Sequence, residues 1–455
     1  MSELAKDILK KAKEEKATFV DLGNCGLRGY LPDELFDDYF IENLEELSLG
    51  NVTKNYLGSQ MEDRWVKFAI SNTNFYKTPN NGEINSFNNG NSLSKISSLL
   101  SLTKLWIANE YKYKGDLESM SFIKGCENLE EIYIVNNLVS KIEGLNQKLM
   151  TLSLSGNSIM KIEALNMNLK KLDLGKNQIE KIEGLNKNLK TLNLRWNKIT
   201  KVEELNENLL TLDLWKNQIN KINGLNRNLQ SLYLHENQIS KIEGLNENLK
   251  TLDLSSNQVS RIEGLNENLE SLNLSRNQIS TIEGLNENLK TLDLSSNQIS
   301  RIEGLNKNLK TLKLSYNQIS KIEKLPQNLV DLEINNNNIF KIENLNSSLR
   351  YLYLQSNLIE KIEGLNSNLK VLDLTNNLIS RIEGLNPSLE NLYIRSNDIK
   401  ILENLNKKLF FLDAADNRIH TITKLNSVIN TLDLRYNKIE TINTLLPFLK
   451  RKKIN

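Results

Sequence analysis

Histidine and cysteine, which often act as catalytic groups or metal ligands, are few in this chain. Its 455 residues include two histidines, His235 and His420, and two cysteines, Cys25 and Cys126. No Cys/His group has the spacing of a metal site, and no serine lies in a G-x-S-x-G turn. A phosphate-binding G-x-x-x-x-G-K-[S/T] loop is also missing. We therefore predict no catalytic residue, no metal and no cofactor, and no enzymatic activity.

An asparagine recurs every twenty residues, from Asn137 to Asn437. A fixed period of this length indicates a solenoid of stacked coils. Just before Asn257, Leu252 and Leu254 alternate with polar residues, which predicts a short β-strand in each coil. Each coil must bend after its strand, so backbone groups lose their sheet partners. We expect the asparagine amide to bond those groups, which is a structural role.

The unit L-x-x-L-x-L-x-x-N-x-V/I resembles the leucine-rich repeat across residues 129–449. Cys25 fits the family's Asn/Cys alternative in a looser N-terminal copy. The twenty-residue length is similar to that of bacterial type III effectors, and the Ile-Glu-Gly-Leu phrase resembles a regulatory subunit of protein phosphatase 1. The N-terminal region resembles bacterial leucine-rich-repeat and Roco-type proteins, without their GTPase. The resemblance implies an α/β-type, mostly β solenoid. A curved parallel sheet would form its concave face, and extended or 3₁₀ chain its convex side.

Four segments are expected along the chain. Residues 1–18 should form a capping helix, with Ser2 as its N-cap. Residues 19–128 should hold irregular repeats with an insertion at about 53–94, residues 129–449 regular repeats, and residues 450–455 a basic tail. The tail either blunts the last strand edge or contacts an acidic partner. The insertion forms a small core of its own or a binding loop, and its aromatic residues are Trp65, Phe68, Phe75 and Tyr76.

Charge and composition narrow the class of partner. The formal net charge is +2, and the basic column containing Lys241 runs beside the acidic column containing Glu243. The two columns should neutralise each other, which argues against nucleic-acid binding. No signal peptide or membrane-spanning apolar run occurs, and two cysteines favour a reducing compartment. We expect a cytoplasmic monomer that binds no membrane. An exported effector without a signal peptide is the alternative location.

Outward-facing strand residues are where coils differ, so they are the candidates for binding a partner. Clustered exposed Trp, Tyr and Arg are typical of binding hot spots. The first cluster, called here the tryptophan patch, spans three successive strands and contains Arg195, Trp196, Trp215, Lys216, Tyr233 and His235. The second, called here the tyrosine patch, contains Tyr351, Tyr353, Tyr393, Arg395 and Phe411. Aspartates that recur on the same face are interpreted as sheet surface, with a cation site as the alternative.

The sequence favours a non-catalytic protein–protein interaction module or scaffold whose partner lies on the concave face. One alternative is a regulatory subunit of an enzyme such as a phosphatase, and another is a secreted bacterial effector. A more remote alternative is ice or glycan binding through a column of threonines, which Ser231 and Ser271 interrupt. The members of that column are Thr191, Thr211, Thr251, Thr291 and Thr311.

Overall fold

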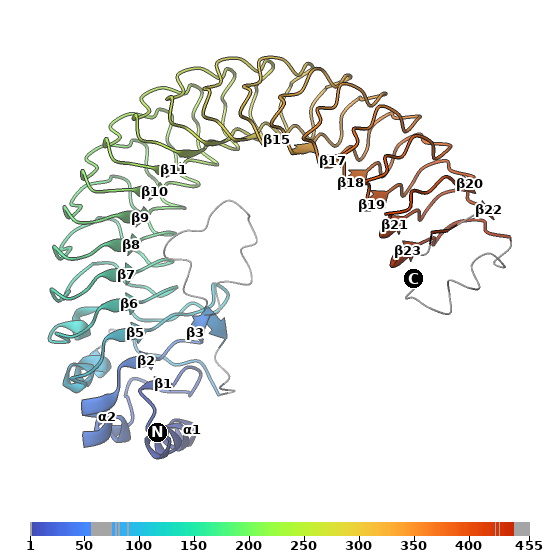
Figure 1. The fold of residues 1–455 in the computed structure, drawn as a ribbon. Helices are drawn as coiled ribbons and strands as arrows, with labels where there is room; N and C mark the ends of the chain where they lie inside the picture. Colours follow the sequence, from blue (N-terminus) through green and yellow to red (C-terminus); the bar gives the residue numbers. More distant parts are fainter. Residues whose placement is uncertain are drawn as a thin grey trace. The chain divides into compact units, whose positions relative to one another are not determined.

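The protein's structure is a computed structural model. It describes residues 2–55, 75–77, 80, 82–88, 91–423, 425, 426 and 428–440. Trp65, Phe68 and the basic tail lie outside the described residues. The chain divides into two compact units, Met1–Asn237 and Gln238–Asn455. Each unit is a stack of coils with its strands side by side on one face, called here the strand face (Figure 1).

Unit 1 begins with helix α1 (Glu3–Glu14). The Ser2 hydroxyl accepts a hydrogen bond from the Ala5 N–H at 3.4 Å, as an N-cap does. Ala5, Leu9 and Ala12 form the buried side of the helix. The predicted N-terminal helix is confirmed. The other helical elements are η1 (Asp33–Phe36), α2 (Asp38–Asn43), η2 (Asn91–Ser98) and η3 (Ser121–Ile123).

The strands of unit 1 run parallel, and each pairs with the strand of the next coil. They are β1 (Phe19–Asp21), β2 (Glu46–Ser48), β5 (Lys104–Trp106), β6 (Glu131–Tyr133), β7 (Thr151–Ser153), β8 (Lys171–Asp173), β9 (Thr191–Asn193), β10 (Thr211–Asp213) and β11 (Ser231–Tyr233). A separate antiparallel pair flanks the insertion and consists of β3 (Val52–Asn55) and β4 (Phe75–Lys77).

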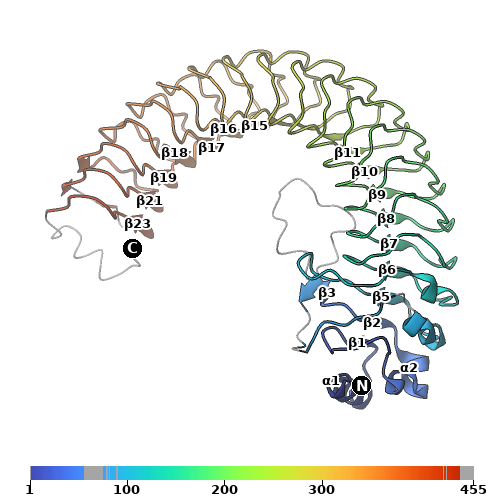
Figure 2. The ribbon, with the colours of Figure 1, turned by 180° about the vertical axis from the view of Figure 1, so that it is seen from behind.

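Unit 2 repeats the parallel arrangement, and Figure 2 shows its strands from behind. Its main strands are β12 (Thr251–Asp253), β13 (Ser271–Asn273), β14 (Thr291–Asp293), β15 (Thr311–Lys313), β16 (Asp331–Glu333), β17 (Tyr351–Tyr353), β18 (Val371–Asp373), β19 (Asn391–Tyr393), β21 (Phe411–Asp413) and β23 (Thr431–Asp433). A second small sheet pairs β20 (Ile401–Leu402) with β22 (Thr421–Ile422). The parallel β-solenoid predicted from the repeat is confirmed.

The repeated leucines and isoleucines form the core of each coil. In the coil of β14, Leu292, Leu294 and Ile299 are completely buried, and Ile302 nearly so. These side chains pack on the same positions of the adjacent coils, so the core is continuous along each stack. The intervening strand residues therefore point outward, which leaves them free to vary.

The asparagine of the twenty-residue repeat bonds the backbone where each coil leaves its strand. The Asn297 amide nitrogen donates to the carbonyls of Leu274 and Leu294, at 2.9 and 3.0 Å. Its oxygen accepts the Ile279 N–H at 3.0 Å. Because Asn297 is 9% exposed, water cannot replace these bonds. The structural interpretation of this column is confirmed.

Two further asparagine columns form hydrogen bonds between adjacent coils. These bonds were not predicted from the sequence. The Asn306 amide donates to the carbonyls of Asn286 and Leu289, at 2.9 and 3.2 Å. Two residues later, the Asn308 amide donates to the Glu287 carbonyl at 2.8 Å. Most Leu-Asn-x-Asn phrases therefore bond the segment that leads into the next strand to the preceding coil.

The first coil obtains its amide from outside the repeat. Cys25 stands at the asparagine position, and its thiol cannot bond several backbone groups at once. Asn85, from the region predicted as an insertion, donates to the carbonyls of Leu22 and Leu49 at 2.7 and 2.9 Å, and accepts the Leu27 N–H at 2.8 Å. Part of the predicted insertion thus completes the solenoid.

On the strand face, Asp and Asn perform the same local task. The Asp293 carboxylate accepts the Ser295 N–H at 2.9 Å, and the Asn273 side chain accepts the Ser275 N–H at 3.0 Å. Both side chains are buried. Burial raises the pKa of Asp293, because a carboxylate loses hydration in this position.

Replacing Asn297 with alanine should destabilise unit 2 strongly. The change leaves the Ile279 N–H and two buried carbonyls without this partner, at roughly 1–3 kcal/mol for each buried group. Equilibrium denaturation followed by circular dichroism should show a lower midpoint. Gln298→Ala, at the exposed next position, is the control and should leave the midpoint nearly unchanged. Equal effects of the two substitutions would contradict the bonding role.

Replacing Asp293 with asparagine should stabilise the protein at neutral pH. The folded-state pKa of Asp293 is raised, so its carboxylate opposes folding above that pKa, and protonation at low pH removes the penalty. Asparagine keeps the backbone bond, as Asn273 shows. Melting temperatures measured from pH 7 to pH 4 should show an advantage of the variant that shrinks as pH falls. An advantage that grows toward low pH would contradict a raised pKa of Asp293 in the folded protein.

Candidate functional site

The groups most capable of chemistry lie in the interior or apart from one another. Cys25 and Cys126 are buried free thiols, and burial raises their pKa to about 12 and about 11, respectively. A thiol with such a pKa is not a nucleophile at neutral pH. Across the described ranges, no three metal-ligating side chains come together. Within the same ranges no helix is long and apolar enough to cross a membrane.

The structure brings the tryptophan patch together at the ends of β9, β10 and β11. The Trp196 and Trp215 rings meet edge to face, with centroids 6.0 Å apart. Trp215 also stacks on His235, at 4.5 Å and an interplanar angle of 22°. The backbone supports this arrangement, because the Trp196 N–H donates to the Trp215 carbonyl at 2.7 Å and the Lys216 N–H to the His235 carbonyl at 2.9 Å.

Trp196 lies between two lysines. The Lys216 ammonium is 3.7 Å from the centre of its ring and 3.5 Å from the Glu236 carboxylate. The Lys176 ammonium is 5.7 Å from the same ring and 4.5 Å from the ring of Tyr111. Cations at these distances are attracted to the face of an aromatic ring. The side chains therefore order one another before any partner arrives.

Two of these contact residues, Tyr111 and Lys176, were not among the residues predicted from the sequence for the tryptophan patch. Tyr111 is 76% exposed and follows β5, outside the regular repeats. Lys176 stands one residue before a ladder asparagine, in the same coil position as Trp196, so the twenty-residue register could have identified it. Burial, and then the neighbouring Arg195 guanidinium, lower the pKa of Lys176. The patch thus carries closely spaced positive charges.

The backbone presents Trp196 outward. Its φ is 55°, in the left-handed region that bulky residues rarely adopt. The same coil position is left-handed in other repeats, where Lys216, Ser256 and Tyr316 stand. The side chain at this position therefore projects from the strand face, and Trp196 is 39% exposed despite its contacts.

Glycine makes room for the patch at a neighbouring coil. A Cβ atom on Gly175 would lie 2.9 Å from Cγ of Arg195, so the glycine lets the arginine side chain lie flat across it.

Trp215 is partly buried, and its Nε1 is fully buried without an acceptor in the part of the chain that the structure describes. An acceptor on a partner's surface would need that tryptophan to shift.

The tyrosine patch is more extended. Tyr393 and Phe411 contact each other, with ring centroids 4.8 Å apart. Tyr351 and Tyr353 are two strands away from Tyr393, with β18 between them. Arg395 follows β19 on the same face. The five residues thus share the strand face of unit 2 without forming one contiguous cluster.

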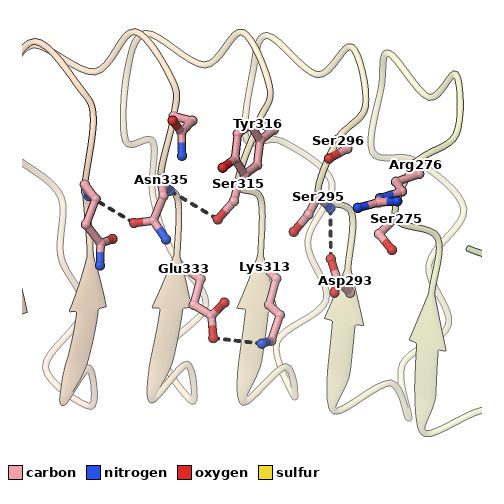
Figure 3. A pocket seen from close by; sticks show the side chains of 12 residues that line it. Ser275, Arg276, Asp293, Ser295, Ser296, Lys313, Ser315, Tyr316, Glu333 and Asn335 are labelled. Atoms are coloured by element: carbon pink, nitrogen blue, oxygen red, sulfur yellow. Dashed lines mark hydrogen bonds and ion pairs between the residues drawn. The ribbon is translucent and has the colours of Figure 1, made fainter. Parts of the chain in front are cut away.

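A polar depression on the strand face of unit 2 was not predicted (Figure 3). The Lys313–Glu333 ion pair, at 2.8 Å, lies along one side. Tyr316 is 61% exposed and stands where the adjacent coils have Ser296 and Asn336. The change from serine to tyrosine at that position is a sequence signal that could have indicated it.

Comparisons with known proteins agree with the repeated coils of the solenoid. A family profile described as leucine-rich repeats in two copies matches residues 227–267, 247–287, 267–307, 287–327 and 347–387. A single-copy leucine-rich repeat profile matches residues 165–181 and 185–202. No curated protein sequence matches the chain.

Solved structures with the same fold include YopM from Yersinia enterocolitica. It is 25% identical, with a TM-score of 0.67, over 96% of this chain and 91% of that one. YopM from Yersinia pestis, a leucine-rich effector protein, is 23% identical, with a TM-score of 0.52, over 68% and 84%. A chain of the Drosophila Toll–Spatzle complex is 20% identical, with a TM-score of 0.56, over 80% and 56%. The coil, its asparagine ladder and these matches together identify the chain as a leucine-rich repeat protein.

Proposed function

We propose that this chain is a non-catalytic interaction module that binds a protein partner through the tryptophan patch. The observation that carries the proposal is the ordered stack of Lys216, Trp196, Trp215 and His235 on an outward-facing edge. Large aromatic surfaces that are already ordered lose little conformational entropy on binding. Residues of this kind contribute most of the energy at protein interfaces.

The charges of the patch favour a partner with acidic and apolar groups. Lys176, Arg195 and Lys216 surround Trp196, while Glu236 pairs with Lys216 at 3.5 Å. A partner carboxylate could replace Glu236 beside Lys216, and an apolar side chain could cover the indole. The likeness in fold to YopM and to a chain of the Toll–Spatzle complex supports a binding role over an enzymatic one. The cytoplasmic location and the monomeric state stay proposals.

Replacing both tryptophans with serine should weaken partner binding without unfolding the protein. Serine stands at the equivalent positions in another coil, Ser255 and Ser256, so the backbone accepts it. Loss of two hot-spot residues should raise Kd by roughly thirtyfold or more. Affinity capture followed by calorimetry on the isolated partner would measure the change, with melting temperature as the check on folding.

Tyr316→Ala provides the matched control for this experiment. Tyr316 is an exposed aromatic residue at the same coil position as Trp196, with φ 58° against 55°. Its removal should leave the Kd unchanged. Unaltered binding by the double serine variant, or equal loss in the control, would overturn the assignment of the patch.

A secreted bacterial effector is the second candidate function. It is favoured by the likeness to YopM across nearly the whole chain, since YopM of Yersinia pestis is a leucine-rich effector. A reporter enzyme fused to the chain should then be found inside cultured host cells after exposure to the producing bacterium. Retention of the reporter in the producing cell would count against this function.

A further inference from the structure

The strand face of unit 2 carries a column of alternating acidic and tyrosine side chains. Parallel pairing from β16 to β23 places the third residue of each strand in register with its neighbours. The column, called here the acid–tyrosine column, consists of Glu333, Tyr353, Asp373, Tyr393, Asp413 and Asp433. Its side chains all face outward, because the preceding residue of each strand is a buried leucine.

The carboxylates at the two ends of the column form ion pairs, whereas those in its middle do not. Glu333 pairs with Lys313 at 2.8 Å, and Arg435 binds both oxygens of Asp433, the shortest contact being 2.6 Å. Between these pairs, Asp373 and Asp413 form no ion pair with any described residue. They accept hydrogen bonds from neutral groups instead, for example the Thr375 N–H at 2.9 Å and the Ala415 N–H at 3.1 Å.

Arg395 is the basic residue next to this middle section, and it too forms no ion pair among the described residues. Burial raises the pKa of Asp373, and the Asp413 carboxylate raises it further, against hydrogen bonds from Thr375 and Gln355 that lower it. Burial, Asp373 and Asp413 also raise the pKa of Tyr393. Burial is the largest cause of both pKa shifts, and the neighbouring carboxylates add to it. A bound cation would therefore relieve an existing repulsion.

The aromatic side chains complete a surface suited to cations. Tyr393 lies in register between Asp373 and Asp413, and it packs on Phe411 at 4.8 Å. A lysine or arginine head group can contact a ring face and a carboxylate at once, and each contact strengthens the other. One strand beyond Tyr353, Oδ1 of Asp331 is buried and has no hydrogen-bond partner among the described residues.

We propose that the acid–tyrosine column binds an extended polypeptide segment that carries lysine or arginine at regular intervals. This goes beyond the proposed function, because it assigns a second surface on unit 2 and the chemistry of its occupant. Charge complementarity carries the choice. Nucleic acid and anionic lipid surfaces would be repelled by the same carboxylates.

The strand spacing suggests how the basic residues are placed in that segment. Neighbouring strands lie about 4.8 Å apart, so carboxylates on alternate strands repeat at about 9.6 Å. A polyproline II chain rises about 3.1 Å per residue with three residues per turn, so every third side chain repeats on one face at about 9.3 Å. A segment with a basic residue at each third position would place successive basic residues opposite Asp373 and Asp413.

The test uses a fluorescent peptide of six Lys-Pro-Pro repeats and the full-length protein. Fluorescence anisotropy should show saturable binding that weakens with salt, and a Glu-Pro-Pro peptide of the same length should not bind. Replacing Asp373 and Asp413 with asparagine should weaken binding of the lysine peptide at least about tenfold. The double variant should fold, because Asn193 and Asn273 occupy the same coil position and make the same backbone bond.

A charge-matched control separates the column from general electrostatics. Glu263→Gln with Glu283→Gln removes two exposed carboxylates of unit 2 away from the strand face, and it should leave the affinity unchanged. Failure of the lysine peptide to bind, or equal losses in the two double variants, would overturn the proposal. The variant without Trp196 and Trp215 should still bind the peptide. If the tryptophan patch proves not to bind a partner, the proposal for the acid–tyrosine column is unaffected. If the lysine peptide does not bind, the proposed function of the tryptophan patch is likewise unaffected.

Discussion

The rest of the structure depends on hydrogen-bonding the backbone where each coil leaves its strand. A three-residue strand cannot satisfy the groups that follow it, and the leucine core offers them no partners. The asparagine amide, with two donors and an acceptor, bonds its own coil and the preceding one. Two further asparagine columns donate to carbonyls of the preceding coil in the segment that leads into the next strand. The coil can be as short as twenty residues because amides replace the helix or second sheet that would otherwise pair this backbone.

This frame leaves few positions on which function can depend. In each coil the strand contributes two outward side chains, and the turn before the asparagine contributes two more. Ser, Thr, Asn or Asp fill more than half of these places in the regular repeats. The tryptophan patch and the acid–tyrosine column are the departures, and their charges differ in kind. Lysine and arginine surround the indoles of unit 1, whereas carboxylates without an ion pair among the described residues flank Tyr393 in unit 2. The two surfaces therefore suit chemically different ligands.

The features that depend on the twenty-residue repeat could be predicted from the sequence. The ladder role of Asn297, the outward direction of Trp196 and the N-cap at Ser2 all come from local spacing. The alternation of Tyr353, Asp373 and Tyr393 was also available from the period, since twenty-residue spacing implies in-register pairing. Other features could not be predicted from the sequence. Asn85 serves a coil some sixty residues earlier, and Tyr111 reaches Lys176 from an irregular loop. Such contacts depend on how non-repeating segments fold back, and no pattern in the sequence specifies it.

The ladder bonds have a consequence for how such a chain can change over generations. Asn297 bonds groups in its own coil and in the one before it, and Asn277 and Asn317 do the same at the same offsets. Deleting or duplicating one whole twenty-residue segment would join equivalent coils and restore every such bond. A gene that encodes nearly identical consecutive segments is prone to unequal recombination. The number of coils is thus free to drift, while a surface confined to two or three adjacent strands is inherited intact.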